Sequence, residues 1–272
     1  MNEPPPSQNG RIRLVASDLD GTLLRSDDSV SERTLEALAR TVEAGIRFVL
    51  VSARSPGWLA PEAARLGLDG IGICSNGAVV YDYEAGRVLI HRPLEPETAR
   101  ELVYGLRREA PGVVFGCERL SGFVAEPAYR SLFRPSDSIP RADALAFVRE
   151  PVTKLVLQHP DLSQAELHAL AGDFAGSQVE VSYSGAGLVE IAAAGVTKGS
   201  ALAELCEELG IASSETIAFG DMVNDVSMLE WAGRGIAVAN AHAEVLAVAD
   251  EVTASNDEDG VALVLEQLLA RG

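Results

Sequence analysis

The segment Leu14–Leu24, an apolar run that ends in two carboxylates, constrains this chain more than any other stretch. Asp18 and Asp20 stand two residues apart, and a turn-forming Gly21-Thr22 follows at once. At the end of a buried strand, this spacing can place both carboxylates beside one site. Two anionic groups held together repel each other, so they favour a divalent cation or unequal protonation. A solvated turn rich in Asp and Gly is the alternative interpretation of these residues alone.

A second acidic cluster lies near the other end of the chain. The segment Thr216–Asp225 is again an apolar run that opens into carboxylates, Asp221 and Asp225, with Asn224 between them. Two acidic strand ends indicate one composite, oxygen-rich site of the kind that holds Mg²⁺. The two clusters are therefore predicted to share one magnesium site.

Two further segments add a hydroxyl and a cation. Phe48–Arg54 is an apolar strand that ends near Ser52, and Gly195–Gly199 places Lys198 at the start of a helical pattern. The chain has only two lysines against twenty arginines, so a lysine that remains indicates a need for a compact ammonium group. A carboxylate nucleophile, a metal, a hydroxyl and a lysine together describe phosphoryl transfer through an aspartyl-phosphate.

Taken in their order along the chain, these four segments resemble the four motifs of the haloacid dehalogenase-like phosphohydrolases. The tail Gly235–His242, together with Ser255–Gly260, resembles their Cof-type sugar-phosphatase branch. The resemblance covers the beginning and the last third of the chain, and the central residues carry no motif of their own. It implies a Mg²⁺-dependent phosphatase that hydrolyses a small phosphorylated metabolite, with sugar phosphates as the first expectation.

Two alternatives stay open on the same scaffold. Cap-bearing relatives include phosphomutases, which use the same two aspartates and transfer phosphate to a sugar acceptor. The other alternative is a catalytically idle metabolite-binding protein, whose expected signature is the loss of Asp18, Asp20, Lys198 or Asp221. None of these four residues is lost here.

The proposed chemistry gives each acidic residue a role. Asp18 is the expected nucleophile, since a carboxylate can attack phosphorus and leave a hydrolysable acyl-phosphate. Asp20 is the expected general acid and base. The resemblance implies that hydrolases and mutases carry an acid there, whereas ion pumps and dehalogenases do not. The expected metal ligands are an oxygen of Asp18, the backbone carbonyl of Asp20, and Asp221, with Asp225 either a ligand or a neighbour of one.

Phosphate binding is expected to involve Gly21, Thr22, Ser52, Lys198 and Asn224. Backbone N–H groups after the first strand can face the phosphate, a hydroxyl and an amide can donate to it, and the lysine neutralises charge. A helix cap is the alternative role for the serine and the asparagine. Candidate substrate contacts are Arg54, Asn76 and Lys154, each with a structural role as the alternative.

One position departs from the pattern of the family. Met222 follows Asp221 where relatives often carry a polar residue such as Asn. A thioether cannot replace that hydrogen-bonding group, so we expect the hydrogen bonds around the metal-binding loop to differ from those of the relatives. The metal ligands themselves are intact.

The net charge of −18 argues against nucleic-acid backbones and anionic membranes as partners. No apolar run approaches the ~20 residues that span a bilayer, and residues 1–10 read as a short disordered lead without the apolar core of a signal peptide. Three cysteines without CxxC spacing fit reduced thiols. We expect a cytoplasmic protein, a monomer or small homo-oligomer, whose partner is a small phosphorylated metabolite.

Apolar runs that alternate with helical patterns predict an α/β fold, with a Rossmann-like parallel sheet covered by helices on both faces. Strands are expected at 12–17, 46–51, 71–74, 215–219 and 235–239, and helices at 31–44, 57–67, 198–209, 224–232 and after Asp257. Residues 11–82 and 189–272 form the predicted core. The block 83–188 is expected to be an inserted α+β domain, and the resemblance implies that it is a cap that selects the substrate. Around and within this block we expect a hairpin at 79–90, a helix at 97–108, strands at 112–116, 121–125 and 153–158, and a loop at 135–140.

Overall fold

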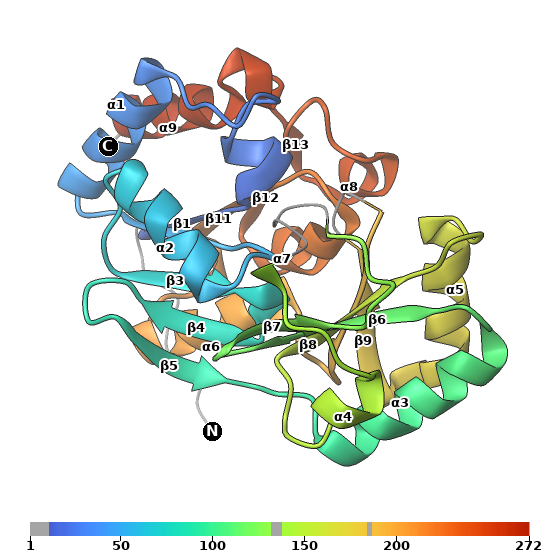
Figure 1. The fold of residues 1–272 in the computed structure, drawn as a ribbon. Coiled ribbons are helices and arrows are strands. Elements are labelled where there is room, and N and C mark those ends of the chain that lie inside the picture. The colour runs from blue at the N-terminus through green and yellow to red at the C-terminus, as the bar shows by residue number, and fades with distance from the viewer. Residues whose placement is uncertain (1–10, 132–137, 184–186, 272) are drawn as a thin grey trace, which may run out of the picture.

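The structure, a computed structural model, describes residues 11–131, 138–183 and 187–271. It has two lobes, each built on its own sheet (Figure 1). The core lobe contains a parallel sheet with the strand order β13 (Glu251–Val252), β12 (Arg234–Ala237), β11 (Thr216–Gly220), β1 (Leu14–Ser17) and β2 (Arg47–Leu50). The predicted disordered lead lies outside the described residues.

Both faces of the core sheet are apolar. Successive residues of a strand point to opposite faces, so neighbouring apolar residues belong to different clusters. Val15 packs with helices α1 (Glu32–Glu43), α2 (Pro56–Arg65) and α9 (Gly260–Arg271) in one cluster. Its neighbours Leu14 and Ala16 pack with α6 (Lys198–Leu209), α7 (Val226–Trp231) and α8 (Ala243–Val248) in another. The prediction of a parallel sheet covered on both faces is therefore confirmed.

The core sheet continues beyond β2 through a hairpin. Val51 forms a parallel bridge with Ile73, so β3 (Ile71–Cys74) follows β2. Strand β4 (Val79–Asp82) then pairs antiparallel with β3, and β5 (Arg87–His91) pairs antiparallel with β4.

The cap lobe has an antiparallel sheet in the order β7 (Gly122–Ala125), β6 (Val114–Arg119), β8 (Lys154–Gln158), β10 (Val189–Ala193) and β9 (Val179–Ser182). Helices α3 (Pro96–Glu109), α4 (Ala144–Phe147) and α5 (Gln164–Ala175) pack on one face and share a core with Phe115 and Leu155. Within the described residues, no helix combines the length and the apolar character needed to cross a bilayer.

The strand pairing differs from the predicted domain boundaries at 83 and 188. Strand β5 pairs with β4 on the core sheet, whereas β10 pairs with β8 and β9 on the cap sheet. We therefore propose that the chain passes between the lobes near residues 92–95 and 194–197. The boundary predicted at 83 falls between the two strands of the hairpin, and the boundary predicted at 188 falls directly before β10. An apolar strand in a sequence does not reveal its neighbour. Part of the predicted loop at 135–140 lies outside the described residues.

Candidate active site

The candidate site lies where three adjacent strands of the core sheet end. Asp18 follows β1, Ser52 lies just beyond β2, and Asp221 follows β11. The carboxyl ends of parallel strands lie at one edge of the sheet, which is where ligands bind in such folds. The backbone N–H of Asp18 donates to the carbonyl of Phe219 at 2.9 Å, which ties the first acidic loop to the last residues of β11.

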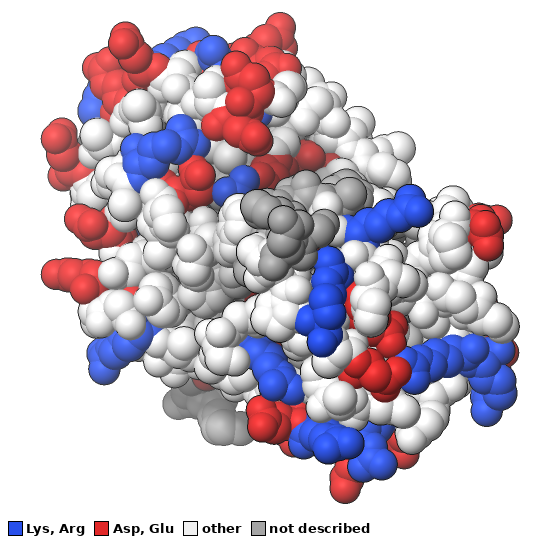
Figure 2. All heavy atoms as spheres, viewed as in Figure 1, with Lys and Arg blue, Asp and Glu red and all other residues white. Residues whose placement is uncertain are grey.

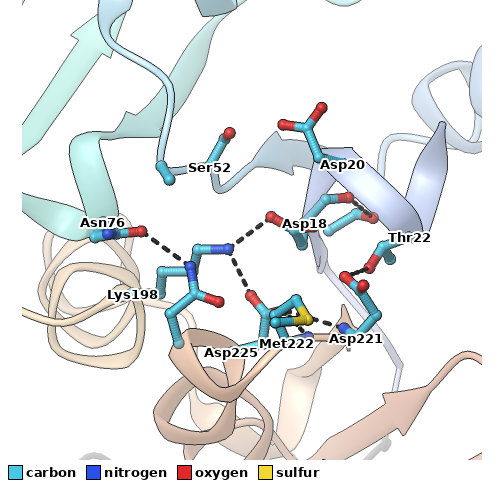
Figure 3. Close-up of polar contacts among 12 residues, drawn as sticks. Asp18, Asp20, Thr22, Ser52, Asn76, Lys198, Asp221, Met222 and Asp225 are labelled. Carbon is cyan, nitrogen blue, oxygen red and sulfur yellow. Dashed lines mark hydrogen bonds and ion pairs between the residues drawn. The ribbon is translucent and has the colours of Figure 1, made fainter. Parts of the chain in front are cut away.

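Lys198 is the centre of the polar contacts (Figure 3). Its Nζ donates to Oδ1 of Asp18 and to Oδ1 of Asp225, at 2.6 Å in each case. The side chain is almost fully buried at the start of α6. Burial alone would lower the pKa of Lys198, but the two carboxylates raise it above its ordinary value. The lysine therefore keeps its proton and stays an ammonium group.

Asp225 also fixes the loop that carries Asp221. Its Oδ2 accepts the backbone N–H groups of Asp221 at 3.0 Å and of Met222 at 2.9 Å. Both oxygens of this buried carboxylate therefore have protein partners. A Cβ at Gly220 would lie 2.4 Å from the Asp225 Cβ, so only glycine allows the strand to approach it this closely.

The carboxylates of Asp18, Asp221 and Asp225 suit a hard divalent cation. One oxygen from each lies within 4.8 Å of the others, and all three residues are buried. Burial raises the pKa of Asp18 well above its ordinary range, although Lys198 opposes the shift. Burial, and then repulsion from Asp225, raise the pKa of Asp221 to about 6. One ammonium group does not balance three carboxylates, and the carboxylate oxygens of Asp18 and Asp221 fit Mg²⁺.

The loop after β1 closes tightly on Asp221. The hydroxyl of Thr22 donates to Oδ1 of Asp221 at 2.8 Å. Gly21 has a φ of +83°, and a Cβ there would lie 2.5 Å from Oδ2 of Asp221. Glycine is therefore required at this position for two reasons, its backbone conformation and its close approach to the carboxylate.

Asp20 does not contact Asp18 through its side chain. It pairs instead with Arg54, whose Nε and Nη2 donate to its two oxygens at 2.9 and 2.5 Å. Ser52 is fully buried, and its Oγ accepts the backbone N–H of Arg54 at 3.1 Å. The loop after β2 therefore holds the carboxylate that the sequence predicts to be the general acid.

A buried polar network joins the cap to this edge of the core. Lys154 of β8 pairs with Glu190 of β10 and donates to the carbonyl of Ala53 at 2.7 Å. Asn76 donates to Glu190 at 2.9 Å, and its own carbonyl oxygen accepts from Asn224 at 3.1 Å.

The acceptor-only carboxylate of Glu190 fixes how both asparagines are oriented. The amide nitrogen of Asn76 has to face Glu190, so its oxygen faces the amide nitrogen of Asn224. The side-chain oxygen of Asn224 is buried without a hydrogen-bond partner, and this residue lines the cavity between the lobes.

That cavity has a volume of about 980 Å³ and contains Asp18, Asp20, Arg54, Lys154, Asp221 and Asn224 from the predicted set. Ser52, Asn76, Lys198 and Asp225 lie behind its wall and contact residues that line it. Sequence reasoning missed Glu118 and Glu190, which also line the cavity. Each is a single acidic residue within an apolar strand. An acid that interrupts an apolar run was the feature of the sequence that could have identified them.

Surface charge differs between the two lobes in the view of Figure 2. Acidic side chains crowd the lobe that carries α1 and α9, whereas arginines gather over the cap. With its net charge of −18, the chain repels phosphate esters at long range. Any attraction for such a ligand has to come from the site itself.

Comparison with known proteins agrees with this arrangement. The family model of the haloacid dehalogenase-like hydrolases matches residues 15–265. Pyridoxal phosphate phosphatase YbhA of Escherichia coli (strain K12) is 33% identical over 270 residues, which cover 92% of this chain and 96% of that protein. Phosphatase YwpJ of Bacillus subtilis (strain 168) is 30% identical over 300 residues, which cover 95% and 100%.

Solved structures show the same fold in both lobes. SMU.1108c from Streptococcus mutans UA159 has a TM-score of 0.83 and 27% identity, covering 95% of this chain and 99% of that one. A haloacid dehalogenase-like hydrolase from B. subtilis has a TM-score of 0.80 and 27% identity, covering 94% and 100%. The chain therefore belongs to the haloacid dehalogenase-like hydrolases and is a phosphatase of their Cof-type branch, as its sequence motifs predict.

Proposed function

We propose that the chain is a Mg²⁺-dependent hydrolase of small phosphomonoesters that works through an aspartyl-phosphate on Asp18. One observation supports the proposal best. The buried ammonium of Lys198 contacts Asp18 directly, and Asp18 faces a cavity of about 980 Å³, the size of small-molecule sites. A nucleophilic carboxylate, a fixed positive charge and room for a metabolite thus coincide.

In the proposed first step, an Asp18 oxygen attacks phosphorus, the bond from phosphorus to the ester oxygen breaks, and protonated Asp20 gives its proton to that oxygen. In the second step, water attacks the phosphorus of the aspartyl-phosphate and loses a proton to Asp20. The bond from phosphorus to the Asp18 oxygen then breaks and releases phosphate. Because Arg54 donates to both oxygens of Asp20, this pair has to separate, and Asp20 has to take a proton from solvent, before Asp20 can protonate the leaving group.

Asp18, the backbone carbonyl of Asp20, and Asp221 would hold Mg²⁺, which supplies positive charge to the phosphoryl oxygens when bound. We place Asp225 beside the ligand set, because both of its oxygens already accept hydrogen bonds from the protein. Its role is to orient Lys198 and the backbone of the Asp221 loop. Lys198 neutralises the charge that gathers on Asp18 and on the phosphoryl group.

The test is a screen of the full chain for phosphate release from small phosphomonoesters, with and without Mg²⁺. Pyridoxal 5′-phosphate belongs in the panel because a relative is named for it, and sugar phosphates belong there from the sequence-based expectation. We expect metal-dependent release that Asp18→Asn abolishes, since the amide is nearly isosteric but a poor nucleophile.

Two outcomes would contradict the proposal. Release that persists in Asp18→Asn would exclude the covalent intermediate, and release in excess chelator would exclude the metal. Phosphate transfer to an added sugar acceptor, in place of release into water, would identify a phosphomutase.

A further inference from the structure

The turn that follows β1, Leu19–Leu23, is held by side chains from the C-terminal part of the chain. In Figure 1 this turn lies beside the segment after β12 and beside the short helical turn Asn256–Glu258 that precedes α9. Both segments belong to the tail whose sequence resembles the Cof-type branch. No residue of that tail belongs to the phosphoryl-transfer machinery described above, so its contacts with the turn call for another role.

Asn240 holds the turn at Gly21. Its amide nitrogen donates to the backbone carbonyl of Gly21 at 2.8 Å. Because a peptide group is planar and trans, this bond also fixes the direction of the next N–H, which belongs to Thr22 and points to the opposite side. Gly21 is therefore bounded on two sides, by Asn240 at its carbonyl oxygen and by the Asp221 carboxylate, which lies 2.5 Å from the position that a Cβ would take.

Asn256 holds both Asn240 and the end of the turn. Its backbone N–H donates to Oδ1 of Asn240 at 2.9 Å. An N–H donor has to face an oxygen, so this bond sets the orientation of the Asn240 amide and directs its nitrogen at Gly21. The side chain of Asn256 is buried and donates to the carbonyl of Leu24 at 2.9 Å. The two asparagines, here called the asparagine clamp, thus fix the middle and the end of the turn that carries Asp20.

We propose that the asparagine clamp positions the Gly21–Thr22 peptide for phosphoryl transfer. The inference rests on the proposed function and adds two positioning residues to it. Backbone N–H groups of this turn are expected to face the phosphoryl group, and preorganised donors contribute most when charge develops on its oxygens in the transition state. Without the amide of Asn240, the Gly21 carbonyl loses its partner and the peptide plane can rotate. Substrate binding in the ground state should change little, because Lys198 stays in place.

The test uses two variants of Asn240 in the full chain, because this side chain is exposed and its replacement should leave the protein folded. Asn240→Leu removes both the donor and the acceptor and adds no charge. Asn240→Asp keeps the acceptor for Asn256 but cannot donate to Gly21. With Mg²⁺ and acetyl phosphate, we expect both variants to lower kcat about 10- to 100-fold and to keep KM within about threefold of the parent.

A binding measurement separates positioning from a general loss of structure. Orthovanadate adopts the five-coordinate geometry of a phosphoryl group in transfer, whereas inorganic phosphate keeps the tetrahedral geometry of the ground state. If the clamp aligns donors for the transition state, Asn240→Leu should raise the Kd of orthovanadate about as much as it lowers kcat. The Kd of inorganic phosphate should change less than about threefold. Calorimetric titration in the presence of Mg²⁺ gives both constants.

Asp257→Ala is the matched control, from the same helical turn as Asn256. The carboxylate of Asp257 accepts the backbone N–H of Ser26 at 2.9 Å and its hydroxyl at 2.6 Å. The variant therefore removes two hydrogen bonds between the same two parts of the chain, but beyond the turn that carries Asp20. It should keep the parental kcat, KM and Kd of orthovanadate. Thermal unfolding checks that all three variants are folded under the assay conditions.

The outcomes separate this inference from the proposed function. Parental kcat and orthovanadate affinity in folded Asn240→Leu would overturn the positioning role alone. An equal loss in Asp257→Ala would also overturn it, because the effect would then belong to the C-terminal contact as a whole. Failure of the parent to hydrolyse acetyl phosphate in the presence of Mg²⁺ would overturn the proposed function and this inference with it.

Discussion

Replacement of Lys198 by methionine tests the electrostatic centre of the site. The ammonium donates to Asp18 and Asp225 at 2.6 Å each, and the side chain is 1% exposed. Methionine keeps an unbranched, apolar stem of similar length but leaves two buried carboxylates without their cation. We expect Lys198→Met to lose at least 10²–10³ in kcat, the range found when one preorganised charge or donor is removed from a site.

The stability of the metal-free variant gives a second measurement. Removal of one partner from a buried ion pair destabilises a protein by about 3–5 kcal/mol. Because each kcal/mol shifts the unfolding midpoint of a chain of this size by about 2–3 °C, the loss is roughly 6–15 °C. The remaining carboxylates can take up protons, since the pKa of Asp18 is already raised by burial. The deficit should therefore be smaller at pH 5 than at pH 7.5, and bound Mg²⁺ should reduce it further.

Lys154→Met is the matched control, because Lys154 is the only other lysine and is also buried between carboxylates. It should be destabilised to a similar extent but should retain measurable Mg²⁺-dependent release from acetyl phosphate. Both proteins would be followed by thermal unfolding and by phosphate release. If Lys198→Met keeps kcat within tenfold of the parent, or if folded Lys154→Met is equally inactive, the role given to Lys198 is wrong.

Three further changes test other contacts. Gly21→Ala puts a Cβ 2.5 Å from an Asp221 oxygen at a φ of +83°, so Mg²⁺-dependent turnover should fall at least tenfold, and parental kinetics would contradict the geometry. In metal-free protein, burial raises the pKa of Asp221 from an ordinary 3.8 to about 6. Between these two pH values the folded chain binds more protons than the unfolded chain, so its stability falls as the pH rises through this range. Mg²⁺ should then raise the unfolding midpoint more at pH 7.5 than at pH 5, and equal increments would exclude the linkage. Glu190→Gln removes the acceptor-only carboxylate that orients Asn76; it should reduce kcat and destabilise the fold by about 1–3 kcal/mol, and an unchanged unfolding midpoint would argue against the network.

The core of the site could be predicted because its residues follow strands in an order that the sequence displays. Asp18 and Asp221 each come directly after an apolar run, and β1 and β11 turn out to be hydrogen-bonded neighbours. Parallel strands present their carboxyl ends at one edge, so adjacent runs in such a sheet bring their acids together. Lys198 was identifiable from its rarity as a residue type, and the structure places it against both acidic clusters.

The cap could not be predicted to the same depth, for a physical reason. Which strands pair in an antiparallel sheet depends on contacts distant in sequence, and apolar alternation alone does not encode them. The boundary predicted at 83 therefore separates β5 from its partner β4, and the boundary predicted at 188 separates β10 from its partner β8. The position of Phe123 and Tyr129 over Gly116 depends on the same unknown register. Arg54 as the partner of Asp20 also required the three-dimensional structure, since two loops have to meet.

The charges at the site explain why a cation should be needed for binding as well as for chemistry. Asp18, Asp221 and Asp225 carry three negative charges when ionised, and Lys198 supplies one positive charge among them. Arg54 and Asp20 neutralise each other at the cavity wall. A phosphate dianion would therefore approach a site of negative net charge within a chain of net charge −18. Mg²⁺ would bring the cluster to neutrality, and separation of the Arg54–Asp20 pair would then offer a guanidinium to the substrate while freeing the acid. On this reasoning the metal binds first, and the substrate itself releases the general acid.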